Sequence, residues 1–212
     1  MINLQNKSPR VLVIGDLIVD QYLWGSCQRI SPEAPVQVIE VDRETKVLGG
    51  AGNVVNNLKN LGAQVDVISV LGNCKISTEL LKLLADINVR TEYIVTQKNR
   101  ISSKKTRIIA SQQQVVRYDR ESSDDINTDS QNTIIKTLKK IVSDYEIILL
   151  SDYGKGILTN QLTQSLIKIA NKYKKKVLVD PKGTDYLKYK DAFLLTPNKK
   201  EASIATNINI ID

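Results

Sequence analysis

Short aliphatic runs alternate with amphipathic segments through most of this chain of 212 residues. Residues 11–14 and 65–71 are such runs, and between them residues 52–61 place apolar side chains at helical spacing before Gly62, a typical C-cap. Further along, the pattern predicts helices over residues 78–87, 130–142 and 160–173, and strands over residues 147–150, 177–179 and 193–195. This alternation predicts an α/β fold built on a doubly wound, mostly parallel sheet.

Four polar or glycine-rich clusters stand where these runs end or where a helical pattern begins. They are Gly15-Asp16, Gly49-Gly50-Ala51-Gly52-Asn53, Asp180-Pro181-Lys182 and Thr196-Pro197-Asn198. Ligands of open α/β sheets bind at the carboxyl ends of the strands. Aspartate and asparagine can hold hydroxyl groups, and glycines let backbone N–H groups approach a ligand closely. Each cluster alone is equally compatible with an ordinary turn, but together they predict one pocket for a ligand the size of a sugar.

The composition excludes several kinds of chemistry. The chain has no histidine, which excludes serine–histidine–aspartate and cysteine–histidine nucleophiles, histidine-bound zinc and histidine acid–base catalysis. The formal net charge is +7, but aromatic residues make up only 5% and no long arginine block occurs, which argues against nucleic-acid binding. An anionic small substrate accounts for the positive excess equally well.

The cellular compartment follows from what the sequence lacks. No apolar run approaches the length of a membrane span, and residues 1–10 lack the apolar stretch of a signal peptide. Cys27 and Cys74 lie far apart without metal-ligand spacing, which predicts reduced thiols. We therefore expect a cytoplasmic protein with no membrane partner.

Two regions interrupt the alternation of strands and helices. Residues 36–41, 91–95, 105–110 and 115–118 have strand-like composition without intervening helical patterns. They predict a small antiparallel sheet, with strands within residues 36–46 and 91–119, that projects from the main domain as a lid. The acidic segment 121–129 is expected to be a solvated connector. No internal repeat or Pro/Gly-rich linker divides the chain.

Six motifs narrow the interpretation. They are Gly15-Asp16-Leu17-Ile18-Val19-Asp20, Arg29-Ile30-Ser31-Pro32-Glu33-Ala34-Pro35-Val36, Gly49-Gly50-Ala51-Gly52-Asn53-Val54, Ser151-Asp152-Tyr153-Gly154-Lys155-Gly156, Asp180-Pro181-Lys182-Gly183-Thr184-Asp185 and Leu195-Thr196-Pro197-Asn198. In this order, over residues 11–201, they resemble the ribokinase-like (PfkB) carbohydrate kinases. Within that family they look most like the D-glycero-β-D-manno-heptose 7-phosphate kinase domain, which many bacteria fuse to an adenylyltransferase.

The resemblance implies ATP-dependent phosphorylation of the anomeric hydroxyl of heptose 7-phosphate. The product would be heptose 1,7-bisphosphate, a precursor of ADP-heptose in lipopolysaccharide core biosynthesis. The substrate-binding residues that the resemblance implies are Asp16, Asp20, Arg29, Gly49, Gly50, Asn53, Lys105, Arg107, Gln113, Arg117, Asp152 and Lys155. The arginines and lysines among them suit the sugar phosphate. Cations on an edge sheet also discourage aggregation, so a solvent-facing role is the alternative for those in the lid.

The resemblance also implies ATP and Mg²⁺. Asn198-Lys199-Lys200-Glu201 matches the family's Asn-x-x-Glu motif and, with Lys182 at the same edge of the sheet, is expected to contact the nucleotide phosphates. Glu201 is expected to hold Mg²⁺ through water, because this ion keeps several of its waters when bound. The motif also has the form of a capping box, and the two interpretations are compatible.

One family motif has no counterpart in this sequence. The family's Gly-Ala-Gly-Asp segment supplies an anion hole and the general-base aspartate, and no Gly-x-Gly-Asp occurs here. We therefore expect residues 1–212 to be the N-terminal portion of a ribokinase-like domain, with its catalytic base beyond residue 212. The chain alone should be nearly inactive, because phosphoryl transfer depends on positioning and charge stabilisation.

Three interpretations of function and one of assembly stay open. Besides the heptose 7-phosphate kinase, the chain could be another PfkB sugar kinase, or a non-catalytic module that binds sugar phosphate or dimerises. The intact enzyme is expected to form a homodimer through the lid, because a small sheet packed on one face only would expose apolar side chains.

Overall fold

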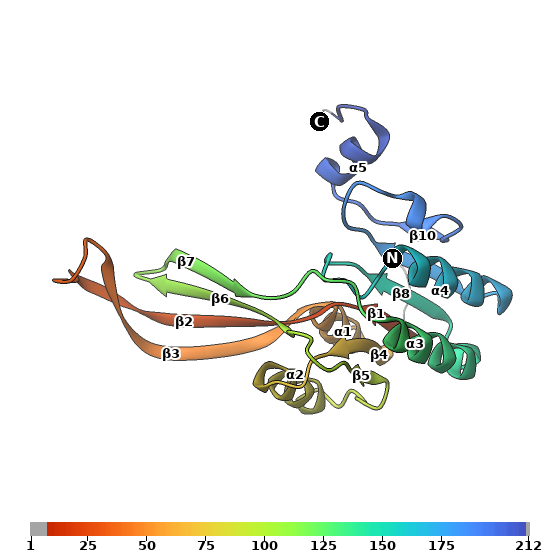
Figure 1. Cartoon of the computed structure of the whole chain (residues 1–212), viewed down its shortest axis with the longest axis horizontal. Coiled ribbons are helices and arrows are strands. Elements are labelled where there is room, and N and C mark those ends of the chain that lie inside the picture. Colours follow the sequence, from red (N-terminus) through yellow and green to blue (C-terminus); the bar gives the residue numbers. More distant parts are fainter. Residues whose placement is uncertain (1–7, 211–212) are drawn as a thin grey trace.

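The computed structural model describes residues 8–210, which form two sheets (Figure 1). The main sheet has six parallel strands in the order β10-β9-β8-β1-β4-β5. Their bounds are β1 (Arg10–Gly15), β4 (Gln64–Leu71), β5 (Ile94–Thr96), β8 (Ile147–Ser151), β9 (Lys176–Asp180) and β10 (Leu194–Leu195). The chain runs outward from β1 first through β4 and β5, and then on the other side through β8, β9 and β10. This is the doubly wound topology that the alternation predicted.

Helices cover both faces of the main sheet. They are α1 (Ala51–Asn60), α2 (Lys75–Asp86), α3 (Thr128–Ile141) and α4 (Asn160–Lys172), and short 3₁₀ turns occupy Val142–Asp144 and Leu187–Tyr189. In β1, Leu12 and Ile14 pack into the core cluster that contains α3 and α4, whereas Val11 and Val13 pack into the cluster that contains α1 and α2. Because both faces are buried, the strands are continuous aliphatic runs in the sequence.

The second sheet is the lid, and it extends away from the main domain (Figure 1). Its strands, in the order β3-β2-β6-β7, are β2 (Leu17–Ile30), β3 (Gln37–Gly50), β6 (Ser103–Ala110) and β7 (Gln113–Arg120). β2–β3 and β6–β7 are antiparallel hairpins, but β2 and β6 pair in parallel. The predicted antiparallel lid is therefore wrong in one respect: the sheet is mixed, because β2 and β6 both leave the main domain in the same direction.

Two sequence-based assignments of strands need correction. Residues 91–95 were expected in the lid, but β5 lies at the edge of the main sheet, parallel to β4. Ile94 packs there against the core cluster of α1 and α2, a contact that the lid could not offer. The sequence also did not predict β2 as a strand, although it is one of the two longest in the described chain.

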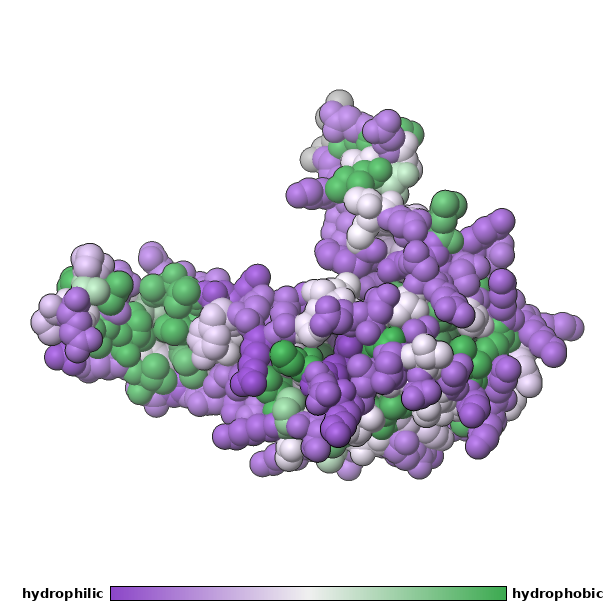
Figure 2. All heavy atoms as spheres, in the orientation of Figure 1, coloured by the Kyte–Doolittle hydropathy of each residue, from purple (hydrophilic) through white to green (hydrophobic). Residues whose placement is uncertain are grey.

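Apolar side chains are exposed along the lid, as the space-filling view shows toward its far end (Figure 2). They include Ile30, Val36, Val41, Val47, Val115, Val116 and Tyr118, each between 44% and 58% exposed. At the opposite end of the described chain, α5 (Lys199–Thr206) follows β10 and buries none of its residues.

Candidate active site

Three aspartates lie at the carboxyl ends of neighbouring strands in the main sheet. Asp16 follows β1, Asp152 follows β8, and Asp180 is the last residue of β9. The register places Gly15 beside Ser151 and Ser151 beside Asp180. Between β1 and β8 the sheet changes its winding direction, which is the position of the ligand crevice in open α/β sheets.

Asp16 is only 1% exposed, and its carboxylate binds the loop that follows β8. Its Oδ2 accepts hydrogen bonds from the N–H groups of Tyr153 at 2.9 Å and Lys155 at 3.2 Å, and Oδ1 accepts one from Ile157 at 3.3 Å. Burial raises the pKa of Asp16 above its usual value, although these three hydrogen bonds favour the charged form. The carboxylate that the motif assigns to sugar hydroxyls thus also shapes residues 153–157.

The glycines before α1 bring the base of the lid against the main sheet. Gly50 has a φ of +57°, and a Cβ there would lie 2.4 Å from the backbone oxygen of Asp16. A Cβ on Gly49 would lie 2.1 Å from Oδ2 of Asp20. Asn53 is exposed on the first turn of α1. The predicted glycine segment therefore lies at the site, and both Gly49 and Gly50 are needed for close approach.

One face of the lid carries the predicted cations, each paired with a carboxylate. Arg107 binds Asp20 at 2.5 Å across β2 and β6. Lys105 binds Asp119 at 2.7 Å, and Arg117 binds the same carboxylate at 3.1 Å. Arg107 and Arg117 are directly opposite in the β6–β7 register. The structure therefore brings four of the predicted substrate residues, Asp20, Lys105, Arg107 and Arg117, together at the base of the lid.

Glu121 joins this group to the main domain. Its carboxylate binds Lys105 of β6 at 2.9 Å and Lys155, in the loop after β8, at 2.6 Å. The expectation of a solvated connector over residues 121–129 is wrong in this respect, since the Glu121 side chain is 21% exposed and Ile126 is buried. Lys105 and Lys155 hold the Glu121 carboxylate, and Ile126 packs in the core cluster that contains α3 and α4. Sequence reasoning missed Glu121 because it stands in an acidic segment without a motif.

Arg29 and Gln113 lie away from this group. Arg29 is nine residues beyond Asp20 on β2, which is roughly 30 Å along a strand. Gln113 pairs with Ala110 beside the turn of the β6–β7 hairpin. Within the part of the chain that the structure describes, neither side chain is brought to Asp16.

Asp152 is held by partners that the sequence did not indicate. Its Oδ1 accepts a hydrogen bond from the N–H of Gly154 at 2.8 Å, and its Oδ2 binds Lys188 Nζ at 2.5 Å and the Tyr189 hydroxyl at 2.7 Å. Burial, together with Asp152, raises the pKa of Tyr189, so the phenol stays protonated. The same hydroxyl accepts a hydrogen bond from the N–H of Lys182 at 3.0 Å. Asp152 thus fixes the position of the Asp180-Pro181-Lys182 loop.

Three of the predicted nucleotide residues, Lys182, Asn198 and Glu201, line a cleft of about 290 Å³ at the ends of β9 and β10, and Asp152 lines it as well. Lys182 Nζ binds Glu201 at 3.0 Å. Asn198 Oδ1 accepts a hydrogen bond from the Glu201 N–H at 2.9 Å, and Glu201 Oε2 accepts one from the Asn198 N–H at 3.0 Å, which completes a capping box. Lys199 and Lys200 are exposed on the first turn of α5. The cleft therefore brings together Lys182, Asn198 and Glu201, whereas Lys199 and Lys200 do not line it.

The charge of Glu201 fits an outer-shell role toward a hydrated cation. Burial raises the pKa of this carboxyl, but the Asn198 N–H and Lys182 outweigh it, and the pKa lies below its usual value. Among residues 8–210, no three acidic or cysteine side chains gather closely enough to hold a metal ion directly. None of the helices in the same range is long and apolar enough to cross a membrane.

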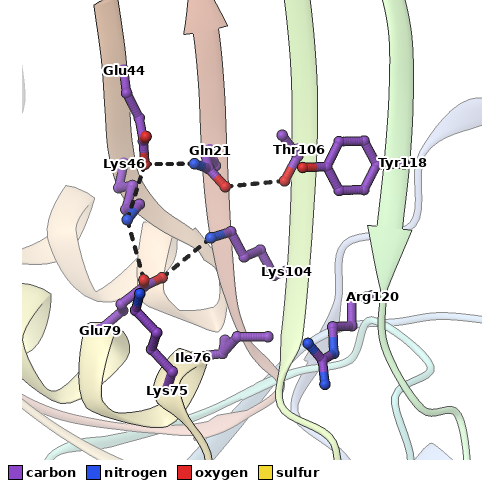
Figure 3. Close-up of a pocket in the computed structure, with 10 residues that line it drawn as sticks. All are labelled: Gln21, Glu44, Lys46, Lys75, Ile76, Glu79, Lys104, Thr106, Tyr118 and Arg120. Atoms are coloured by element: carbon purple, nitrogen blue, oxygen red, sulfur yellow. Dashed lines mark hydrogen bonds and ion pairs between the residues drawn. The ribbon is translucent and has the colours of Figure 1, made fainter.

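A larger cleft, of about 400 Å³, lies on the opposite face of the lid beside α2 (Figure 3). Glu79 of α2 binds Lys46 at 3.1 Å and Lys104 at 3.4 Å there, and Gln21 accepts a hydrogen bond from Thr106. Because side chains alternate along a strand, Lys104 and Thr106 face away from Lys105 and Arg107. None of the predicted substrate or nucleotide residues lines this cleft, which is a polar joint between the lid and α2.

The fold is that of the ribokinase-like carbohydrate kinases, and comparison with known proteins agrees. Residues 8–212 match the model of the pfkB family carbohydrate kinase, and the chain belongs to this family of phosphotransferases. It is 61% identical over 207 residues to the "Bifunctional protein HldE" of Aliarcobacter butzleri, and 56% identical over 209 residues to that of Sulfurimonas denitrificans. These alignments cover 98% and 99% of the chain but 44% of each relative, so the chain spans less than half their length.

Solved structures share the fold at low sequence identity. Phosphofructokinase-2 from Escherichia coli, in complex with fructose-6-phosphate, aligns with a TM-score of 0.70 at 21% identity, over 96% of this chain and 66% of that one. Arabidopsis thaliana ribokinase, complexed with ribose and ATP, aligns with a TM-score of 0.65 at 17% identity, over 95% and 64%. These likenesses establish the ribokinase-like fold.

Proposed function

We propose that this chain binds D-glycero-β-D-manno-heptose 7-phosphate and ATP as part of a kinase that phosphorylates the anomeric hydroxyl, giving heptose 1,7-bisphosphate. The observation that carries the proposal is the group of cations at the base of the lid: Lys105, Arg107, Arg117 and Lys155. A sugar that already carries a phosphate needs such cations in addition to those that bind the nucleotide. The six motifs and the high identity to proteins named HldE support the same substrate.

The sugar would lie between the sheet edge and the lid. Asp16 and Asn53 are proposed to bind its hydroxyl groups, with Gly49 and Gly50 allowing the backbone to approach. Asp20 and Asp152 are proposed to act in the same half-site, each held in place by its own cation. A sugar in this position touches both the main domain and the lid.

The nucleotide phosphates would lie over the cleft at the ends of β9 and β10. Lys182, Asn198, Lys199 and Lys200 are proposed to contact them, and Glu201 would hold Mg²⁺ through water. When bound, this ion would neutralise phosphate charge. The general base is proposed to come from the Gly-Ala-Gly-Asp segment that the family resemblance implies.

The proposal is tested by turnover of the longest natural form of the protein with Mg-ATP. Heptose 7-phosphate is compared with unphosphorylated heptose, ribose and fructose 6-phosphate, and the products are identified by ³¹P NMR. We expect kcat/KM for heptose 7-phosphate to exceed the values for unphosphorylated heptose and ribose by about tenfold or more, because a site built for a phosphate rejects sugars that lack it. Fructose 6-phosphate, which carries a phosphate on a different sugar, tests recognition of the sugar itself. Equal or faster turnover of an unphosphorylated sugar would contradict the proposed substrate. Residues 1–212 alone should show no turnover above background, and measurable activity would place the base within them.

We also propose that two copies associate through their lids. The exposed apolar side chains of the lid support this, because large uncovered apolar patches mark interaction surfaces (Figure 2). Sedimentation should show a dimer at micromolar concentration, and Val116→Asp on β7 should shift it to monomer. Leu187→Asp, which changes an equally apolar and 79% exposed side chain outside the lid, should leave the dimer intact. A folded wild-type monomer under these conditions would refute the proposal.

A further inference from the structure

One carboxylate holds two ammonium groups that belong to different parts of the fold. Glu121 Oε2 accepts a hydrogen bond from Lys105 of β6 at 2.9 Å, and Oε1 accepts one from Lys155 in the loop after β8 at 2.6 Å. The three side chains are only 16–21% exposed, so solvent ions screen these pairs less than they would on an open surface. The two lysines therefore meet at an anion that the protein itself supplies.

The backbone beside Glu121 is tethered to the same loop after β8. Arg100 bridges the two segments, since it donates hydrogen bonds to the carbonyls of Asp124 at 3.1 Å and of Lys155 at 2.5 Å. The N–H of Ile126 also donates a hydrogen bond to the carbonyl of Gly156 at 3.0 Å. These contacts hold the connector against the main domain. The long side chain of Glu121, which has no hydrogen-bond partners in the described residues other than the two lysines, can still rotate away from them.

A phosphate monoester matches this carboxylate in position and exceeds it in charge. At pH 7 it carries between about −1.5 and −2 charges and offers three acceptor oxygens. A carboxylate carries one charge and two oxygens. A phosphate that replaces Glu121 between the lysines is therefore attracted to them more strongly than the carboxylate it displaces. A monoanionic group is attracted about as strongly as the carboxylate, and a neutral hydroxyl more weakly.

We propose that Glu121 is a specificity-determining residue that competes with the substrate for Lys105 and Lys155. Its carboxylate occupies the two lysines until a dianionic sugar phosphate displaces it, so that singly charged anions are rejected. This inference rests on the proposed function and names the group that sets its anion selectivity. Both substrate and product of that reaction carry the same phosphate, so the built-in competitor also keeps the product from binding too tightly.

The test is calorimetry on the longest natural form of the protein and its Glu121→Gln variant. The ligands are heptose 7-phosphate, unphosphorylated heptose and inorganic phosphate, with acetate as a competitor. Removing the competing charge should tighten both phosphate ligands by about three- to tenfold and leave heptose unchanged. Acetate should weaken heptose 7-phosphate binding in Glu121→Gln but not in the wild type. Unchanged or weaker phosphate binding in the variant would overturn the proposal, and so would equal acetate competition in both proteins.

Two control variants separate this role from general electrostatics. Asp119→Asn removes a carboxylate of equal charge that binds Lys105 and Arg117 but leaves Glu121 between Lys105 and Lys155, so its gain in phosphate affinity should be smaller. Glu92→Gln, at an exposed pair with Arg90, should change nothing. Equal gains in Asp119→Asn and Glu121→Gln would mean that net charge alone acts, against the proposal.

The outcomes also distinguish this inference from the proposed substrate. If wild type and variant both fail to bind heptose 7-phosphate, the proposed function is wrong, and inorganic phosphate still reports on Glu121. If Glu121→Gln does not fold, Glu121→Asp serves instead: the shorter side chain keeps its charge but should hold the two lysines less well, so a smaller tightening of phosphate binding is expected, and no tightening would count against the proposal.

Discussion

Replacing Asp16 by asparagine tests whether this carboxylate shapes the loop after β8. The amide has one oxygen, which can keep the hydrogen bonds from Tyr153 and Lys155 if it takes the place of Oδ2. Its NH₂ group then faces the N–H of Ile157, a residue only 1% exposed, and leaves that donor unsatisfied. A buried unsatisfied donor costs about 1–3 kcal/mol. The amide avoids the burial penalty that raises the pKa of the carboxyl, so we expect a loss of about 1–2 kcal/mol in unfolding free energy.

The assay is urea unfolding at pH 7, followed by circular dichroism, with Asp180→Asn as the matched control. Asp180 ends β9, which is separated from β1 by β8, and no described residue donates a hydrogen bond to its side chain. Burial, with Glu201 and Asp152 nearby, raises the pKa of Asp180, so ionisation lowers stability as the pH rises through that pKa. Asp180→Asn should therefore be neutral or slightly stabilising at pH 7. Equal effects of the two variants, or unchanged amide exchange at Ile157 in Asp16→Asn, would refute the role given to Asp16.

Two further predictions concern Gly49 and Cys74. Gly49→Ala should destabilise the protein by about 1–3 kcal/mol in urea unfolding, because its Cβ would displace Asp20 from Arg107. In an Asp20→Ala background the same substitution should cost no further unfolding free energy, and an undiminished loss there would refute this cause. Burial raises the pKa of the Cys74 thiol, but hydrogen bonds, chiefly from Ser77, outweigh it and lower the pKa to about 7. The rate of Cys74 alkylation should therefore be half-maximal near pH 7, and Ser77→Ala should move that midpoint upward; an unmoved midpoint would contradict the assignment.

The main sheet could be predicted because its signals are local. Each buried parallel strand is an aliphatic run, and each covering helix has an apolar stripe, so α1 and α4 begin and end within one residue of expectation. The lid gave weaker signals. β2 is buried at its base on both faces and exposed at its tip, so it shows neither a steady alternation nor a uniform run. β5 has only three residues, too few to show a pattern. The packing of its residue Ile94 against the core cluster of α1 and α2 decides to which sheet it belongs.

The candidate site divides in the same way. The carboxyl ends of β1, β8 and β9 could be located from the strand pattern, and with them Asp16, Asp152 and Asp180. The partners of these residues could not, because they are remote in sequence: Asp16 binds N–H groups more than 130 residues away. The same reason hid Glu121 and Lys188, the partner of Asp152, since neither Glu121 nor Lys188 belongs to a motif and each is brought to its partner by the fold alone.

The proposed position of the site at the base of the lid, rather than at its tip, follows from how the chain enters and leaves that sheet. β2 begins directly after Asp16, and β3 returns to Gly49 and Gly50, where the N–H of Ala51 donates a hydrogen bond to the Asp16 carbonyl at 2.9 Å. β6 begins two residues before Lys105, and β7 ends one residue before Glu121. Every crossing between the two bodies thus lies within a few residues of a group assigned to the sugar or its phosphate. A ligand at this junction contacts both bodies at once, and its binding energy must therefore depend on the angle between lid and main sheet. A ligand at the exposed tip, near Gln113, would not sense that angle.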